Sequence, residues 1–130
     1  MEKEIKRILV IDVQLVHKLG FIGYRNHAKR LLDIIEYDND FEVTHIFHPT
    51  KKIDDSRCTN NLENLYNCDG VIIASPNMTH FNYLQKLVTN SNCFIFCEKP
   101  PVTSLDEINY LENISLKNKK RIFFNFNLRF

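Results

Sequence analysis

Residues 70–97, GVIIASPNMTHFNYLQKLVTNSNCFIFC, decide the fold of this chain. They begin and end with short apolar runs, 70–74 and 93–97, that lack a polar face, which is typical of parallel strands covered by helices on both sides. Between the runs, apolar side chains recur with the spacing of one helical face, at Phe81, Leu84, Leu87 and Val88. The stretch therefore predicts a strand–helix–strand unit of a parallel sheet.

The same alternation extends on both sides of this unit. Three further apolar runs predict buried strands, at residues 7–12, 41–47 and 121–126. An amphipathic helix is expected over 22–37, and Ser104 with Glu107 forms a capping box that opens another helix. Residues 50–60 are polar and predict a loop. The pattern predicts an α/β fold with a doubly wound parallel sheet of about five strands, in which residues 1–130 form a single domain.

The composition is that of an ordinary globular protein. Its 130 residues are 44% apolar and 25% charged, which allows one folded domain with a real core. Lys and Arg number 17 against 16 Asp and Glu, and the resulting net charge of +1 argues against a nucleic-acid or membrane-surface role. No apolar run approaches the roughly 20 residues of a membrane span, and the charged start lacks a signal-peptide pattern, so a cytoplasmic location is expected.

The cysteines give little sign of metal or disulfide chemistry. There are four, Cys58, Cys68, Cys93 and Cys97, and no two of them form a C-x-x-C pair. Cys93 and Cys97 are expected on the same side of one strand. Buried free thiols are the favoured interpretation, with a disulfide or a zinc site as the alternative.

In a doubly wound sheet, ligands bind at the carboxyl ends of the strands, near the point where strand order reverses. If the fold binds a dinucleotide, the first loop should carry phosphate-binding glycines, and its best match is the run Lys18-Leu-Gly-Phe-Ile-Gly23. Lys18 stands where the first glycine is expected, while Gly20 and Gly23 occupy the other two positions. The candidate phosphate-binding residues are Lys18, Gly20, Phe21, Ile22 and Gly23. The alternative is an ordinary loop or a helix N-cap.

The second loop begins at His48 and continues through Pro49, Lys51 and Lys52. A dinucleotide site usually presents a carboxylate here to the ribose hydroxyls, and the first one in this sequence is Asp54. A neutral or basic set suits a 2′-phosphate better than a free 2′-hydroxyl, and this gives a slight preference for NADP over NAD. The alternative is an ordinary solvated basic loop.

The third loop, Ser75-Pro-Asn-Met-Thr-His80, has the residues of a helix start, and His80 is either structural or catalytic. The fourth loop is Glu98-Lys99-Pro100, directly after an apolar strand. A partly desolvated lysine at such a place could donate to a substrate oxygen or act as an acid or base. The alternative for this segment is a solvated turn.

Together these loops resemble the Gfo/Idh/MocA oxidoreductases, the relatives of glucose–fructose oxidoreductase and inositol 2-dehydrogenase. The resemblance rests on four segments in the same order, Val71-Ile-Ile-Ala-Ser-Pro-Asn-Met-Thr-His80, Phe96-Cys-Glu-Lys-Pro100, Thr103-Ser-Leu-Asp-Glu107 and residues 124–130. It implies an NAD(P)-binding Rossmann domain. Members of the family move hydride between nicotinamide and a carbon that bears a hydroxyl of a sugar, polyol or nucleotide-sugar.

The resemblance also implies roles for individual residues. Lys99 would touch the reacting hydroxyl as the catalytic residue, and Glu98 and Pro100 would hold it in place. The cofactor-binding set that it implies comprises Gly20 and Gly23 at the pyrophosphate, Ser75 and Pro76 near the diphosphate and ribose, Asn77 and His80 along the nicotinamide ribose, and Arg129 in the cleft.

The sequence departs from the family pattern in three places. The first glycine and the acidic residue after the second strand are missing, and residues 12–18 look like an insertion. The second α/β domain of the family, which supplies the substrate pocket, is absent from this chain. We therefore expect the NAD(P)-binding part of a sugar, polyol or nucleotide-sugar oxidoreductase. The alternative is a degenerate, non-catalytic Rossmann module that serves binding or homo-oligomeric assembly.

Overall fold

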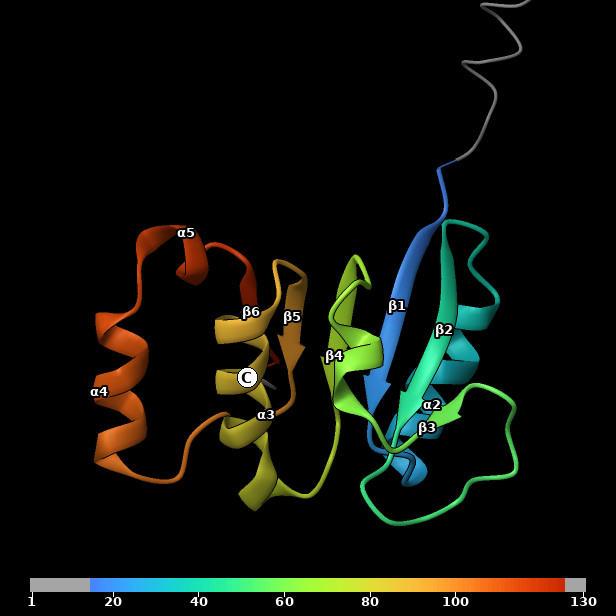
Figure 1. Ribbon diagram of the computed structural model, residues 1–130, viewed down its shortest axis with the longest axis horizontal. Coiled ribbons are helices and arrows are strands. Elements are labelled where there is room, and N and C mark those ends of the chain that lie inside the picture. Colours follow the sequence, from blue (N-terminus) through green and yellow to red (C-terminus); the bar gives the residue numbers. More distant parts are fainter. Residues whose placement is uncertain (1–14, 126–130) are drawn as a thin grey trace, which may run out of the picture.

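The computed structural model describes residues 15–125. They form one parallel sheet whose strand order is β3-β2-β1-β4-β5-β6, which confirms the predicted doubly wound fold (Figure 1). The strands are β1 (His17–Ile22), β2 (Phe41–Phe47), β3 (Cys58–Thr59), β4 (Gly70–Ile73), β5 (Phe94–Cys97) and β6 (Ile122–Phe124). The helices are α2 (Asn26–Glu36), α3 (His80–Asn90), α4 (Leu105–Asn113), α5 (Leu116–Lys119) and the short 3-10 turns η1 (Leu62–Leu65) and η2 (Asn77–Thr79).

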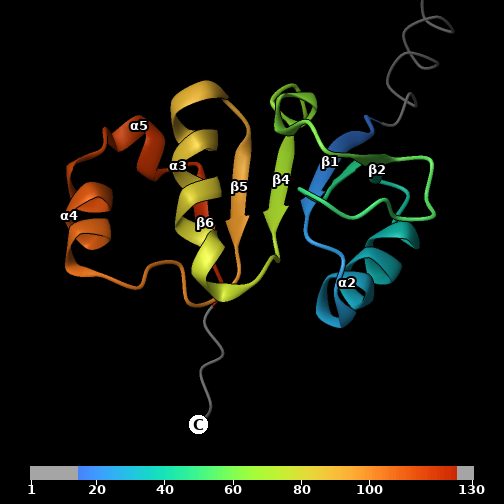
Figure 2. The ribbon, with the colours of Figure 1, turned by 60° about the horizontal axis from the view of Figure 1, so that its bottom comes forward.

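Helices pack on both faces of the sheet, because successive side chains of each strand point to opposite sides. On one face, Phe21 of β1 and Ile72 of β4 pack with Ala28 and Leu32 of α2. On the other face, the neighbouring strand residues pack with α3, and this larger core includes Ile22, Val71, Ile73, Leu84, Leu87, Ile95 and Cys97. Figure 2 shows α2 at the β1–β2 side and α3 beside β5. Because the strands are parallel, the loops that lead from β1 into α2 and from β4 into α3 lie at the same end of the sheet, the carboxyl end of the strands.

The main departure from the sequence prediction lies at the first strand. The predicted strand at 7–12 falls outside the described residues, whereas 18–22, predicted as a phosphate loop, are part of β1. Gly20 lies inside this strand, where an added Cβ would come within 2.9 Å of the Leu65 side chain. The prediction that Lys18, Gly20 and Phe21 form the loop is therefore wrong. Gly20 is required for packing between the sheet and η1.

The remaining elements follow the sequence closely. The β2 strand has the predicted limits, and the capping box at Ser104 and Glu107 is present. The short strand β3 lies in the segment predicted as a loop, and pairs with β2 through only two residues. No helix among residues 15–125 is both long enough and apolar enough to cross a membrane.

The four cysteines are free thiols, and the predicted burial is found for three of them. Cys68, Cys93 and Cys97 are buried, and Cys58 is half-buried. Burial raises the pKa of the Cys97 thiol to about 12, and also raises those of Cys68 and Cys93. These thiols therefore stay protonated at neutral pH. Within the described residues, no group of three His, Cys, Asp or Glu side chains could hold a metal ion.

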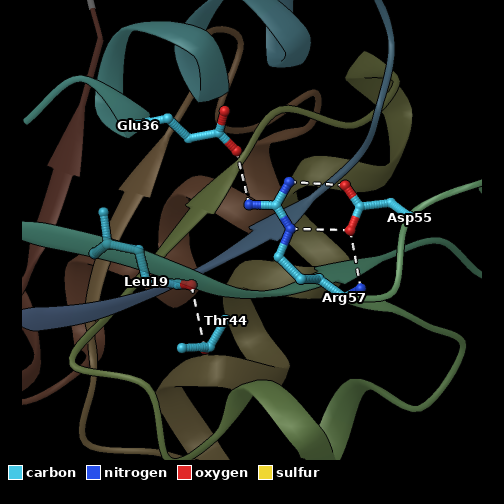
Figure 3. Close-up of polar contacts among 5 residues, drawn as sticks. All are labelled: Leu19, Glu36, Thr44, Asp55 and Arg57. Atoms are coloured by element: carbon cyan, nitrogen blue, oxygen red, sulfur yellow. Dashed lines mark hydrogen bonds and ion pairs between the residues drawn. The ribbon is translucent and has the colours of Figure 1, made fainter.

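A charged cluster holds the long β2–β3 connection against α2. The Arg57 guanidinium donates to both carboxylate oxygens of Asp55, at 2.9 and 2.7 Å, and to Glu36 of α2 at 2.7 Å (Figure 3). Bidentate pairs of this kind are the stronger surface ion pairs. The Arg57 hydrogen bond holds the pKa of Asp55 at about 2, below its usual range. The cluster therefore holds the loop that follows β2 in place against α2.

Replacing Asp55 with asparagine is expected to destabilise the fold by about 1 kcal/mol at neutral pH, because the pair is partly exposed and screened by solvent. The lowered pKa means that the fold favours the charged carboxylate. Its stabilisation is therefore complete above about pH 4 and is lost as the pH falls toward 2. Urea unfolding at several pH values measures this difference. The control is Asp54→Asn, at an exposed neighbour; a wild-type advantage over Asp55→Asn that does not shrink in acid would contradict the prediction.

Candidate functional site

The carboxyl ends of β1, β2 and β4 open into a pocket of about 490 Å³. Strand order reverses between β1 and β4, because the chain proceeds outward to β2 and β3 on one side and to β5 and β6 on the other. Ligands of doubly wound sheets bind at this switch point. The pocket is lined by Ile22, Gly23, Tyr24, Arg25, Lys29, His48, Pro49, Thr50, Lys51, Ile53, Ser75, Pro76, Thr79 and Tyr83.

Gly23 makes the turn from β1 into α2. Its φ is +108°, a conformation that residues with a Cβ rarely adopt, and its N–H donates to the Phe47 carbonyl at 3.1 Å. A Cβ at this position would lie 2.5 Å from the Ala74 carbonyl oxygen. The loop after β1 therefore packs directly against the loop after β4. Only glycine fits between them.

The residues from Gly23 onward correspond to the Gly-x-Gly-x-x-Gly/Ala fingerprint of a dinucleotide-binding turn. Gly23 is its first glycine, Arg25 replaces the second, and Ala28 takes the third position. Ala28 is 2% exposed and packs α2 against the sheet. The third residue of the motif is small because it allows this close packing of helix and strand. The prediction that the first glycine is missing is therefore wrong. The missing one is the second, which normally lets a pyrophosphate approach the main chain.

Basic side chains surround the side of the pocket next to β2. Arg25, Lys29, Lys51 and His48 line it, and no carboxylate does so among the described residues. His48 Nδ1 accepts hydrogen bonds from the main-chain N–H groups of Lys51 at 2.8 Å and Thr50 at 3.2 Å. Partial burial and the nearby charges of Lys51 and Arg25 lower the pKa of His48. His48 is therefore neutral at pH 7, with its proton on Nε2, and the pocket retains the charges of the other three side chains.

The loop after β4 forms the opposite wall. Ser75 and Pro76 line the pocket, and the hydroxyl groups of Ser75 and Thr79 lie 2.7 Å apart. Thr79 also donates to the Pro76 carbonyl at 2.6 Å, so the loop is braced by its own side chains. Asn77 begins η2 and is exposed outside the pocket lining.

The loop after β5 joins three parts of the fold through Glu98. This carboxylate is buried, and His27 Nε2 of α2 lies 3.0 Å from Oε1. The Asn125 amide, just past β6, donates to both carboxylate oxygens at 3.2 Å. Lys99 follows on the exposed side, and the bond between Lys99 and Pro100 is cis. Glu98 thus anchors the segment that carries Lys99.

His80 occupies a different position from the other candidates. It is 1% exposed, lies beneath the loops after β4 and β5, and is not part of the pocket lining. Its ring nitrogens contact two main-chain carbonyls, Ser75 at 2.6 Å and Pro100 at 2.9 Å. This geometry favours a role in holding the loops over direct contact with a ribose.

The sequence prediction and the pocket lining overlap in part. The pocket brings together five predicted residues, Ile22, Gly23, His48, Ser75 and Pro76, while Glu98, Lys99 and Pro100 lie on the next strand along. Lys18, Gly20 and Phe21 lie within β1 instead, and Arg129 lies outside the described residues. Nine further lining residues were not among the predicted site residues: Tyr24, Arg25, Lys29, Pro49, Thr50, Lys51, Ile53, Thr79 and Tyr83. For Tyr24, Arg25 and Lys29, the available signal was an apolar run that ends in Gly23 directly before an amphipathic helix.

Comparison with protein families matches residues 17–126 to the Gfo/Idh/MocA family, described as "Oxidoreductase family, NAD-binding Rossmann fold". The curated proteins contain no match to this chain.

Solved structures share the fold at low sequence identity. An oxidoreductase from Bacillus cereus is 20% identical with a TM-score of 0.68, and the alignment covers 84% of this chain and 34% of that one. GenD2 from gentamicin A biosynthesis, crystallised with NAD, is 13% identical with a TM-score of 0.72, covering 85% and 34%. The apo scyllo-inositol dehydrogenase from Lactobacillus casei is 14% identical with a TM-score of 0.68, covering 86% and 37%.

These 130 residues thus correspond to about a third of the length of their structural relatives. The family match extends over nearly all of the described residues, and the sheet order and the Gly23 turn agree with it. The chain belongs to the Gfo/Idh/MocA oxidoreductase family and corresponds to its NAD-binding Rossmann domain.

Proposed function

We propose that this chain binds NADP(H) as the cofactor domain of an oxidoreductase that acts on the CH–OH group of a sugar, polyol or nucleotide-sugar. The observation that carries the proposal is the Gly23 turn at the switch point, where the loop backbone leaves no room for a Cβ. The first turn of α2 follows directly, and its free main-chain N–H groups suit a pyrophosphate. The family supplies the general expectation of a dinucleotide, and GenD2 was crystallised with NAD.

Arg25 gives the phosphate site its particular character. It is the N-cap residue of α2 and has an extended backbone, so its side chain stands where the second glycine would leave open space. A guanidinium donates to phosphate oxygens in a bidentate manner, and this replaces close approach to the main chain with a charge-assisted contact. In this proposal, the Arg25 guanidinium binds the diphosphate in place of the main-chain N–H groups that a second glycine would expose.

The preference for NADP rests on the wall next to β2. Lys51 and His48 stand where a carboxylate would bind the ribose 2′-hydroxyl, and Arg25 lies close enough to influence the pKa of His48. A 2′-phosphate would find a lysine ammonium, a guanidinium and the Nε2–H of His48 in this region. A free 2′-hydroxyl would find no carboxylate acceptor in the pocket lining among the described residues.

Titration of this chain with NADPH and NADH, followed by nicotinamide fluorescence or calorimetry, tests both parts of the proposal. We expect NADPH to bind about 10-fold more tightly than NADH. Replacing Lys51 with methionine should weaken NADPH by about 10-fold and leave NADH unchanged, because one charged hydrogen bond is worth roughly 1.5 kcal/mol. Lys52→Met is the matched control, since Lys52 is exposed and does not line the pocket.

Two outcomes would contradict the proposal. Tighter binding of NADH than NADPH would overturn the NADP preference and leave the dinucleotide site in place. Absence of binding of either nucleotide below millimolar concentration would overturn the site itself.

For the chemical step, we propose Lys99 as the group that exchanges a proton with the reacting hydroxyl. The nicotinamide supplies or accepts the hydride. Lys99 is exposed at the carboxyl end of β5, beside the buried Glu98 carboxylate that His27 and Asn125 hold. Glu98 orients the segment, and the lysine ammonium can donate to the substrate oxygen as a carbonyl is reduced. Such an acid must lie within hydrogen-bond reach of the reacting oxygen. The parallel pairing of β5 with β4 supports an approach of Lys99 to the nicotinamide half of the proposed site.

A further inference from the structure

The buried ring of His80 contacts both the loop after β4 and the loop after β5, beyond the point where the two strands are paired. Residues of β4 and β5 are paired up to Ile73 and Cys97, and the Glu98 N–H still donates to the Ile73 carbonyl at 3.0 Å. Beyond that point the loops diverge, one into α3 and the other into Pro100. His80, the first residue of α3, spans the gap with its two ring nitrogens.

Both partners of the ring are main-chain carbonyl oxygens, which can only accept hydrogen bonds. Nε2 lies 2.6 Å from the Ser75 oxygen and Nδ1 lies 2.9 Å from the Pro100 oxygen. A neutral imidazole carries one N–H, so one of these short contacts would then set two lone pairs against each other. Both contacts are favourable only if each nitrogen carries a hydrogen, as in the imidazolium form.

We propose that His80 is an imidazolium clamp that holds the loop after β4 to the loop after β5, and is thereby a positioning residue for Lys99. Burying a cation is costly unless hydrogen bonds compensate it, and here two charge-assisted bonds do so. The His80 side chain is not available to bind a ribose, because both ring nitrogens are already hydrogen-bonded to main-chain carbonyls.

The two loops that His80 joins carry different parts of the site. Ser75 lines the dinucleotide pocket, whereas Pro100 follows Lys99 directly. The clamp therefore fixes the distance between the cofactor and the lysine. This consequence rests on the proposed function, but the protonation state and the loop contacts do not.

Nitrogen NMR of the protein labelled at histidine tests the clamp without any ligand. The chain has five histidines, and His80→Gln assigns the His80 signals by their loss. We expect both ring nitrogens of His80 to carry protons near neutral pH, with slow exchange because the ring is buried. His48 is the internal control: its Nδ1 accepts two main-chain N–H groups, so its ring should be neutral. A neutral His80 tautomer would overturn the proposal.

Amide hydrogen exchange tests the coupling of the loops. His80→Gln retains a donor on one side only. The amides of Thr79 and Glu98, which donate to the Pro76 and Ile73 carbonyls, should therefore exchange about 10-fold faster, while those of α2 stay protected. His45→Gln, in the half-buried middle of β2, is the matched control and should leave both loops unchanged. If His80→Gln folds and neither loop amide changes, the clamp is wrong.

Dinucleotide titration separates this proposal from the proposed function. Weaker binding by His80→Gln together with the exchange change supports both. The other informative outcome combines three results: the wild-type His80 is an imidazolium, the loops of His80→Gln exchange faster, and the wild type binds no dinucleotide. That outcome supports the clamp and rejects the cofactor site.

Discussion

Replacing Gly23 with alanine is expected to destabilise the fold by about 2–5 kcal/mol and to abolish dinucleotide binding. The left-handed φ of +108° costs a residue with a Cβ about 1–2 kcal/mol. The new Cβ would also lie 2.5 Å from the Ala74 oxygen and 2.9 Å from the Ser75 nitrogen, and these main-chain atoms cannot move as the end of a side chain can. Relief of the clash would push the loops after β1 and β4 apart, at a further cost of about 1–3 kcal/mol.

Gly70→Ala is the matched control for this experiment. A Cβ there would meet the end of the Leu19 side chain at 3.0 Å, and the Gly70 φ is not positive. It should cost less than about 1 kcal/mol, because a flexible side chain can shift. Urea unfolding gives the stability difference, and nucleotide titration gives the loss of binding. Equal midpoints for the two variants would refute the assigned role of Gly23.

Replacing Arg121 with methionine is expected to destabilise the fold by about 2–4 kcal/mol. This guanidinium is 7% exposed and donates to the Val88 carbonyl at 2.7 Å and the Cys93 carbonyl at 2.8 Å. It also donates to the Asn118 side chain at 3.0 Å. Methionine fills much of the same volume but leaves these acceptors without a partner, and each buried unsatisfied group costs about 1–3 kcal/mol.

Arg121 bonds to the same helix that begins with the site residue His80. Val88 lies in the last turns of that helix, whose first residue is His80. Thermal or urea unfolding measures the loss, and Lys120→Met is the control because Lys120 is exposed beside Arg121. We expect the control to stay within about 0.5 kcal/mol of the wild type. A similar result for Arg121→Met would show that the buried hydrogen bonds contribute little.

Local sequence patterns predicted most elements correctly. The β2 strand, the β4–α3–β5 unit and the capping box at Ser104 depend on apolar spacing and on side-chain to main-chain bonds within a few residues. The loop after β1 was predicted wrongly, because the first strand was assigned to residues 7–12 and because Gly20 and Gly23 reproduce part of the glycine spacing. Pairing of β1 with both β2 and β4 places Gly20 inside the strand.

The sequence alone determined the parallel α/β fold, the Glu98-Lys99-Pro100 segment and the Pro76-to-His80 motif, because hydrophobic spacing and short motifs are local properties. Only the tertiary structure decided that Gly23 is the first glycine of the turn, that Arg25 replaces the second, and that His80 is buried between two carbonyls. These facts depend on contacts between loops that are distant along the chain. Such loops meet because parallel strands bring their carboxyl ends to the same edge of the sheet.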